Sequence, residues 1–246
     1  PLPQPAGQWR TLELVDGGTL HLSAAKSWQV RWQYFDGQWQ NLPPNWQGTV
    51  PGARATVQLR ASAVRGGVRR DCIQMHPPWT DGVGTVMTVF RVTLPPTPAR
   101  LRFFTAIRDH SQSEPPSDGV LFRVWVDDGS GPRALFERFS DAKVWEPGEV
   151  DLSAWAGKTI ELALESHPGP RRDTTCDSSF WGDAAIVSGQ RPPLRTAEEE
   201  LARSRSYPGP PAAVFGRDDE RWELMVLGET PLDAPLLLGC GQRELL

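Results

Sequence analysis

The chain of 246 residues is long enough for one large all-β domain, or for one domain with a smaller layer beside it. Its net charge of −4, without a basic block, excludes electrostatic recruitment of nucleic acid. It contains no apolar run of about eighteen residues, so we expect no membrane-spanning helix. Its 23 glycines and 24 prolines interrupt long helices and favour short strands joined by turns.

The first part of the chain, residues 1–54, is rich in tryptophan and contains strand patterns separated by Asp-Gly turns. In the run 28–35 (WQVRWQYF), the large apolar residues have one parity and share one face of a strand: Trp28, Val30, Trp32 and Tyr34. An exposed face of that size would be a large apolar patch, which favours a core over an aromatic binding platform. We therefore expect this segment to pack on the domain that follows it.

Residues 55–190 carry strand patterns that recur about every ten residues, with turn signals between them. The clearest patterns lie in 56–61, 68–76, 84–94, 99–107, 120–126 and 159–165. This spacing is typical of an antiparallel β-sandwich or jelly roll. We therefore predict an all-β fold whose main domain is a jelly-roll sandwich over residues 55–190.

The pattern changes in the last part of the chain, residues 191–246. The stretch 196–206 is the best helical pattern, with Thr196 as its N-cap and Glu199 three residues later, as in a capping box. A proline-rich linker follows at 207–211, and 221–227 has the pattern of one more strand. We expect a short helix and a tail that either pairs with the N-terminal strands or begins a further domain.

A polar run after the strand pattern 159–165 is the first candidate for a site. Residues 171–183 hold three aspartates and two aromatic residues: Asp173, Asp177, Asp183, Phe180 and Trp181. Carboxylates and an aromatic ring at the edge of a sheet suit a sugar or a calcium ion, and they equally suit a solvated loop.

Three polar loops, 76–81, 108–118 and 167–183, follow strand patterns that can end on the same side of a sandwich. They contain what sugar recognition needs, an aromatic ring for the apolar face of the sugar and planar polar groups for its hydroxyl pairs. The candidate ligand-binding residues are Trp79, Arg108, Asp109, His110, Glu114 and Trp181. The alternative is structural, with Arg108 and Asp109 paired to each other or to a neighbouring loop.

A metal ion is the second candidate ligand. Calcium takes about six to eight oxygen ligands, and four aspartates can supply several of them: Asp118, Asp173, Asp177 and Asp183. Three histidines follow strand patterns and would suit zinc or copper if they converged: His76, His110 and His167. The alternative is that each histidine bonds backbone groups in its own turn.

Motifs of catalysis and of redox chemistry are absent from the sequence. Neither G-x-S-x-G nor H-E-x-x-H occurs, and the 30 acidic residues make a chance pair of carboxylates easy to find. The spacing of the three cysteines excludes C-x-x-C redox and zinc patterns. Cys72 and Cys176 form a disulfide if their strands are neighbours; otherwise all three cysteines are buried thiols.

The middle of the chain resembles a known family. The runs GVLFRVWVDDG (119–129), VDLS (150–153) and DSSFWGD (177–183) are similar to runs in galactose-binding-like β-sandwiches, most of all in carbohydrate-binding modules of the NPCBM type. The resemblance covers about residues 71–187. It implies a jelly roll of about eight strands that binds glycans, with a structural calcium ion common in such sandwiches, appended to secreted polysaccharide-degrading enzymes.

The leading hypothesis is non-catalytic binding of a poly- or oligosaccharide by an accessory module of a secreted enzyme. An aromatic ring would stack on the sugar while polar side chains hold its hydroxyls: Trp79 or Trp181, with Arg108, Asp109 and Glu114. The first alternative is a polysaccharide-active hydrolase or lyase on the same sandwich, and the second is a spacer domain stabilised by calcium. We expect a secreted protein, either a monomer or one part of a larger multidomain enzyme.

Overall fold

The computed structural model describes residues 8–189 and the strand residues 213–217, 220–225, 237–240 and 243–245. The chain divides into two compact units, residues 1–197 and 198–246. Within the described residues, no helix is long and apolar enough to cross a membrane. The predicted helix at 196–206 lies outside the described residues.

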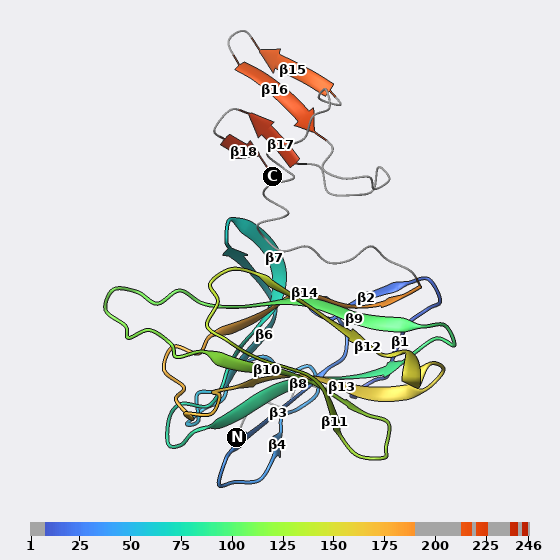
Figure 1. Cartoon of the computed structure of the whole chain (residues 1–246), viewed down its shortest axis with the longest axis vertical. Coiled ribbons are helices and arrows are strands. Elements are labelled where there is room, and N and C mark those ends of the chain that lie inside the picture. The colour runs from blue at the N-terminus through green and yellow to red at the C-terminus, as the bar shows by residue number, and fades with distance from the viewer. Residues whose placement is uncertain (1–7, 190–212, 218–219, 226–236, 241–242, 246) are drawn as a thin grey trace. The chain divides into compact units, whose positions relative to one another are not determined.

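The first unit is a sandwich of two sheets, which Figure 1 shows as facing layers. The first sheet has the order β11 (Arg133–Ser140), β10 (Val120–Asp127), β13 (Thr159–His167), β8 (Gly84–Thr93), β3 (Gln29–Tyr34) and β4 (Gln40–Asn41). The short β1 (Leu12–Glu13) also pairs with β8, in parallel, whereas the other strand pairs of this sheet are antiparallel.

The second sheet is antiparallel throughout the described pairs. Its order is β12 (Glu146–Asp151), β9 (Ala99–Ile107), β14 (Ser179–Ser188), β7 (Val68–His76), β6 (Thr56–Arg65) and β5 (Gly48–Thr49), and β2 (Thr19–His21) pairs with β14. A single 3₁₀ turn, Ser153–Trp155, is the helical element of the described sandwich. The predicted all-β sandwich fold is therefore confirmed.

The N-terminal segment is part of both sheets. β3 pairs with β8 in the first sheet, and β2 pairs with β14 in the second. Trp28 and Val30 lie in the core, while Trp32 and Tyr34 pack against it partly buried. The prediction that this face is a core face, and not an exposed platform, is confirmed.

The core between the sheets is built from large side chains of alternating strand positions. Trp181 on β14 is fully buried, and its ring centroid lies 5.0 Å from that of Phe103 and 5.3 Å from that of Phe122. Since none of this side chain reaches the surface, the prediction that Trp181 stacks on a ligand is wrong. In the sequence Trp181 follows a polar loop, but in the fold its ring packs in the core.

A smaller apolar cluster lies apart from the main core, and contains Cys72, Phe104, Trp145 and Phe180. The Arg70 guanidinium lies 3.4 Å from the ring centroid of Phe104 and covers it. Burial raises the pKa of the Cys72 thiol to about 12, with a smaller contribution from Asp71. Cys72 and Cys176 are both free thiols in this structure.

Strand register places the three predicted loops at one end of the sandwich. Ser179, at the start of β14, lies opposite Met75 near the end of β7 and opposite Ile107 at the end of β9. His167, the last residue of β13, lies opposite Leu121 near the start of β10. The loops that follow β7, β9 and β13 therefore share one end.

The second unit contains one antiparallel sheet. Its order is β15 (Ala213–Arg217), β16 (Glu220–Met225), β17 (Leu237–Cys240) and β18 (Arg243–Leu245). The strand predicted at 221–227 corresponds to β16. Its neighbours β15, β17 and β18 were not predicted.

Candidate functional site

A groove with a volume of about 670 Å³ lies on the outer face of the first sheet. Side chains of a strand point alternately to its two faces, and on this sheet Val30, Phe122 and Leu164 point into the core. The intervening positions therefore face outward. The strand register brings four of them into one row across β10, β13, β8 and β3: Arg123, Glu165, Met87 and Arg31.

A second row beside the first supplies the apolar part of the groove. It contains Trp125, Ala163, Val89 and Gln29, on the same four strands. Ala163 and Val89 are short side chains that line the groove between Trp125 and Gln29. Phe35 and Trp39, from the connection between β3 and β4, line the groove as well. Trp39 is 41% exposed, so part of its ring is open to solvent.

The Trp125 ring is held in place by a buried carboxylate. Its Nε1–H donates to Glu165 Oε2 at 2.6 Å, and the Thr85 hydroxyl donates to Glu165 Oε1 at 2.6 Å. Glu165 is only 3% exposed. A ring fixed before a ligand arrives loses little rotamer freedom on binding, which favours affinity.

The arginines of the groove are held in ion pairs with glutamates. Glu161 accepts from Arg31 Nη2 at 2.8 Å and from Arg91 Nη2 at 2.9 Å, so one carboxylate bridges two guanidinium groups. Arg123 Nε donates to Glu137 Oε2 at 2.7 Å. Each planar guanidinium carries five N–H donors. These pairs therefore fix the planes of the arginines without using all of their donors.

His167 closes the end of the groove next to Phe35, with ring centroids 4.8 Å apart. Its Nδ1 accepts a hydrogen bond from the Gly169 N–H at 3.0 Å, which places the ring proton on Nε2. Burial, helped by the positive charges of Arg123 and Arg172, lowers the pKa of His167 to about 4. The imidazole is therefore neutral at physiological pH.

The ligand-binding residues predicted from the sequence lie outside this groove, and three of them, Arg108, Asp109 and Glu114, are held in ion pairs. Arg108 Nη2 lies 3.0 Å from both carboxylate oxygens of Glu114, and Arg65 Nη1 donates to Asp109 at 3.1 Å. Asp109 thus pairs with a residue outside its loop, as the structural alternative has it, whereas Arg108 pairs within its own loop. His110 is exposed. A role in glycan binding for these residues remains a prediction.

Trp79 is the most open aromatic residue of the predicted set. It is 50% exposed, and the Arg54 guanidinium lies 5.3 Å from its ring centroid. Its backbone N–H donates to the Ala53 carbonyl at 3.1 Å, which fixes the loop. Trp79 therefore offers a second surface that a sugar ring could reach.

The zinc or copper site considered for His76, His110 and His167 is not formed among the described residues. His76 Nδ1 lies 2.7 Å from the Pro77 carbonyl oxygen, and His167 bonds the backbone of its own turn. No group of three or more His, Cys, Asp or Glu side chains in the described part of the chain is placed to hold a metal ion. The alternative in which these two histidines bond turn backbone fits the structure.

Of the predicted calcium ligands, the structure brings Asp118, Asp173 and Asp177 close enough for their charges to interact. Burial, together with the charges of the other two, raises the pKa of Asp177 to about 8, although the Ser117 hydroxyl donates to Asp177 Oδ1 at 2.7 Å. Asp177 Oδ2 and both oxygens of Asp118 are buried without a hydrogen-bond partner. Asp183 instead pairs with Arg70 at 2.6 Å. Carboxylate oxygens are of the type that calcium prefers, but the three without a hydrogen-bond partner come from two residues only, and Asp118 Oδ2 also lies 3.9 Å from Arg171 Nε.

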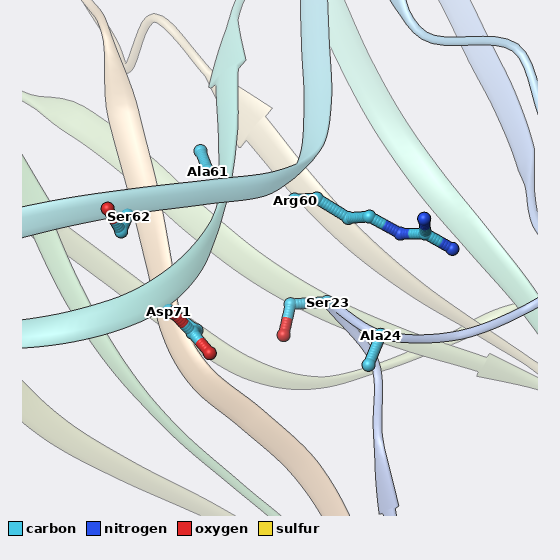
Figure 2. A pocket seen from close by; sticks show the side chains of 6 residues that line it. All are labelled: Ser23, Ala24, Arg60, Ala61, Ser62 and Asp71. Atoms are coloured by element: carbon cyan, nitrogen blue, oxygen red, sulfur yellow. The ribbon is translucent and has the colours of Figure 1, made fainter.

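A second depression of about 440 Å³ lies where the loop carrying Ser23 meets β6 and β7. Figure 2 shows Ser23 and Asp71 on opposite sides of it, with the Arg60 guanidinium extending away from both. No aromatic ring lines it. It therefore lacks the stacking surface that the groove on the first sheet provides.

The groove was missed in the sequence because its residues come from distant strands. One signal was present: in 120–126 (VLFRVWV), Arg123 and Trp125 share the parity opposite to the apolar core residues, and in 159–165 Glu161 and Glu165 do so as well. A tryptophan among charged residues on an outward face marks a candidate binding face. Only the strand order shows that these outward faces are neighbours.

Comparisons with known proteins leave the family of the chain open. No family model matches it. An uncharacterized protein of Archaeoglobus fulgidus is 32% identical over 104 residues, which are 40% of this chain; the chain spans about a quarter (26%) of the length of that relative.

Three solved structures are similar at low identity. A CBM61 module in complex with β-1,4-galactotriose is 18% identical over 48% of this chain and 70% of its own, with a TM-score of 0.35. The tandem CBM51 modules of a family 98 glycoside hydrolase from Streptococcus pneumoniae SP3-BS71 are 12% identical over 70% of this chain and 47% of theirs, with a TM-score of 0.41. The K1 cleaved adhesin domain of Lys-gingipain from Porphyromonas gingivalis W83 is 14% identical over 70% of this chain and 98% of its own, with a TM-score of 0.40.

Proposed function

We propose that the sandwich binds a carbohydrate chain in the groove on its first sheet. The observation that supports this most strongly is the fixed Trp125 ring, which lies in a groove of about 670 Å³ beside Trp39 and paired arginines and glutamates. The apolar C–H face of a sugar ring stacks on an indole. Its hydroxyl groups pair with planar guanidinium, carboxylate and amide groups.

The hydrogen bonds of the groove support binding without catalysis. Both oxygens of Glu161 accept from arginines, and both oxygens of Glu165 accept from Thr85 or Trp125. A glycosidase acid has to carry a proton into the reaction. Carboxylates that already accept hydrogen bonds on both oxygens are poorly placed for that role. The same proposal has three further parts. The chain is a module of the NPCBM type, it accompanies a glycoside-active enzyme, and it is secreted.

Substitution of two exposed tryptophans distinguishes binding in the groove from binding at the loop end of the sandwich. Trp39 lies in the groove and is 41% exposed, while Trp79 lies at the loop end and is 50% exposed. Affinity electrophoresis in gels that contain single soluble polysaccharides is expected to show retardation of the wild-type chain. Trp39→Ala should abolish that retardation, and Trp79→Ala should preserve it.

The reverse result would move the site to the loops predicted from the sequence. Analysis of the polysaccharides by mass after incubation adds the enzymatic alternative to the same test. Release of soluble fragments, lost on Glu161→Gln, would contradict binding without catalysis.

A structural calcium ion is a separate proposal, supported by the buried oxygens of Asp118 and Asp177 that have no hydrogen-bond partner. Bound calcium would neutralise two carboxylates that repel each other in this structure. Melting temperatures measured with calcium and with a chelator test it. An equal melting temperature under both conditions would overturn it.

A further inference from the structure

We infer that the groove takes neutral glycans and rejects chains that carry carboxylate or sulfate groups. This inference rests on the proposed carbohydrate binding and names the class of chain that the same groove accepts. It is carried by the charges of the groove and by the way in which they are paired.

The side chains that line the groove carry no excess of positive charge. Two arginines, Arg31 and Arg123, face three carboxylates, Asp127, Glu161 and Glu165. Three further charged residues border the groove: Arg91 at Glu161, Arg172 over the Phe35 ring and Glu137 at Arg123. With them included, four arginines balance four carboxylates. His167 adds no charge, because its Nδ1 accepts a hydrogen bond from the backbone.

Each lining arginine already has an anionic partner. Arg31 Nη2 lies 2.8 Å from Glu161, and Arg123 lies 2.7 Å from Glu137 and 3.9 Å from Glu165. To bind an anionic sugar, an arginine has to share or give up such a partner. Glu165 is buried, so weakening its contact with Arg123 leaves a carboxylate poorly compensated, which is costly. Like charges placed side by side at an interface also disfavour binding.

A neutral sugar fits the same groups without disturbing the pairs. A hydroxyl both donates and accepts, so it can accept from the unused N–H groups of an arginine and donate to a carboxylate. Gln29, Gln33 and Asn41 also line the groove and offer amides that donate and accept. A carboxylate or sulfate on the ligand only accepts, so it cannot pair with the groove carboxylates.

The test uses the intact chain and gels that contain one polysaccharide each. Neutral galactan, xylan and mannan form one set, and polygalacturonate, alginate and chondroitin sulfate form the other. Wild-type protein is expected to be retarded by at least one neutral chain and by none of the anionic chains at low ionic strength. Glu161→Gln removes the negative charge that pairs with Arg31 and Arg91, so this variant is expected to gain retardation by an anionic chain.

Glu149→Gln is the matched control. Glu149 also bridges two arginines, Arg100 at 2.7 Å and Arg102 at 3.3 Å, but on the second sheet. The Glu149→Gln variant should gain no retardation by anionic chains. An equal gain in both variants would show a general charge effect and overturn the role of the groove pairs.

Failure of the inference and failure of the proposed function give different results. Retardation of the wild type by an anionic chain, lost on Trp39→Ala, overturns neutral selectivity and leaves carbohydrate binding in the groove intact. No retardation by any polysaccharide overturns both.

Discussion

Replacing Trp125 by phenylalanine removes one hydrogen bond and keeps an aromatic ring in the groove. The indole N–H donates to Glu165 Oε2 at 2.6 Å, and Glu165 is 3% exposed, so water cannot easily replace the donor. Hydrogen bonds to charged groups contribute about 1.5–3 kcal/mol, and an unsatisfied buried acceptor costs a similar amount. We therefore expect Trp125→Phe to lower the free energy of unfolding by about 2 kcal/mol.

The assay is urea unfolding followed by tryptophan fluorescence and circular dichroism, with Trp39→Phe as the control. Trp39 is 41% exposed and can give its N–H to water, so its replacement should change the free energy of unfolding by less than about 0.5 kcal/mol. A double-mutant cycle with Glu165→Gln isolates the coupling between the two side chains. Equal effects of Trp125→Phe and Trp39→Phe, or a coupling near zero, would refute the claim that Glu165 fixes the Trp125 ring.

Three further perturbations test other parts of the structure. In chelator, Asp177→Asn should raise the melting temperature at pH 8 and change it little at pH 4. The pKa of Asp177 is raised to about 8 in the fold, so its ionisation destabilises the fold as pH rises from about 4 to 8. A wild-type melting temperature that rises over this window more than that of the variant contradicts this. His167→Gln should reduce the loss of stability on acidification. The pKa of His167 is about 4 in the fold and 6.5 in the ordinary imidazole, so its protonation destabilises the fold as pH falls from about 6.5 to 4. Parallel stability curves of variant and wild type between pH 7 and 4 would count against this prediction. Gly182→Ala places a Cβ 2.7 Å from the Trp145 ring and should cost about 1–3 kcal/mol in urea unfolding; an unchanged midpoint would show that the ring moves aside freely.

The strands were predictable because most of them bury one face against the core. Burial on one side forces apolar residues to alternate with polar ones, and this alternation is visible without any knowledge of neighbours. The patterns at 68–76 and 99–107 match β7 (Val68–His76) and β9 (Ala99–Ile107). The core face of β3 was predicted for a related reason, since Trp28 and Trp32 exposed together would form a large apolar patch.

The candidate site was not predictable in the same way, because it depends on strand order. Arg31, Arg123 and Glu165 become neighbours only when β8 and β13 lie between β3 and β10. The groove residues were missed as a site, whereas Trp181 was wrongly assigned to one. It follows a polar loop in the sequence, but it is an inward-facing residue of the central strand β14, so its ring fills the core.

The most direct test of the proposed function is the NMR spectrum of the tryptophan indole N–H groups during titration with the polysaccharide that retards the chain. The account predicts that the indole signals of Trp39 and Trp125 shift with the added glycan, while that of Trp79 stays in place. Shifts at Trp79 without shifts at Trp39 and Trp125 would place the sugar on the loop end of the sandwich and contradict the groove as its binding site.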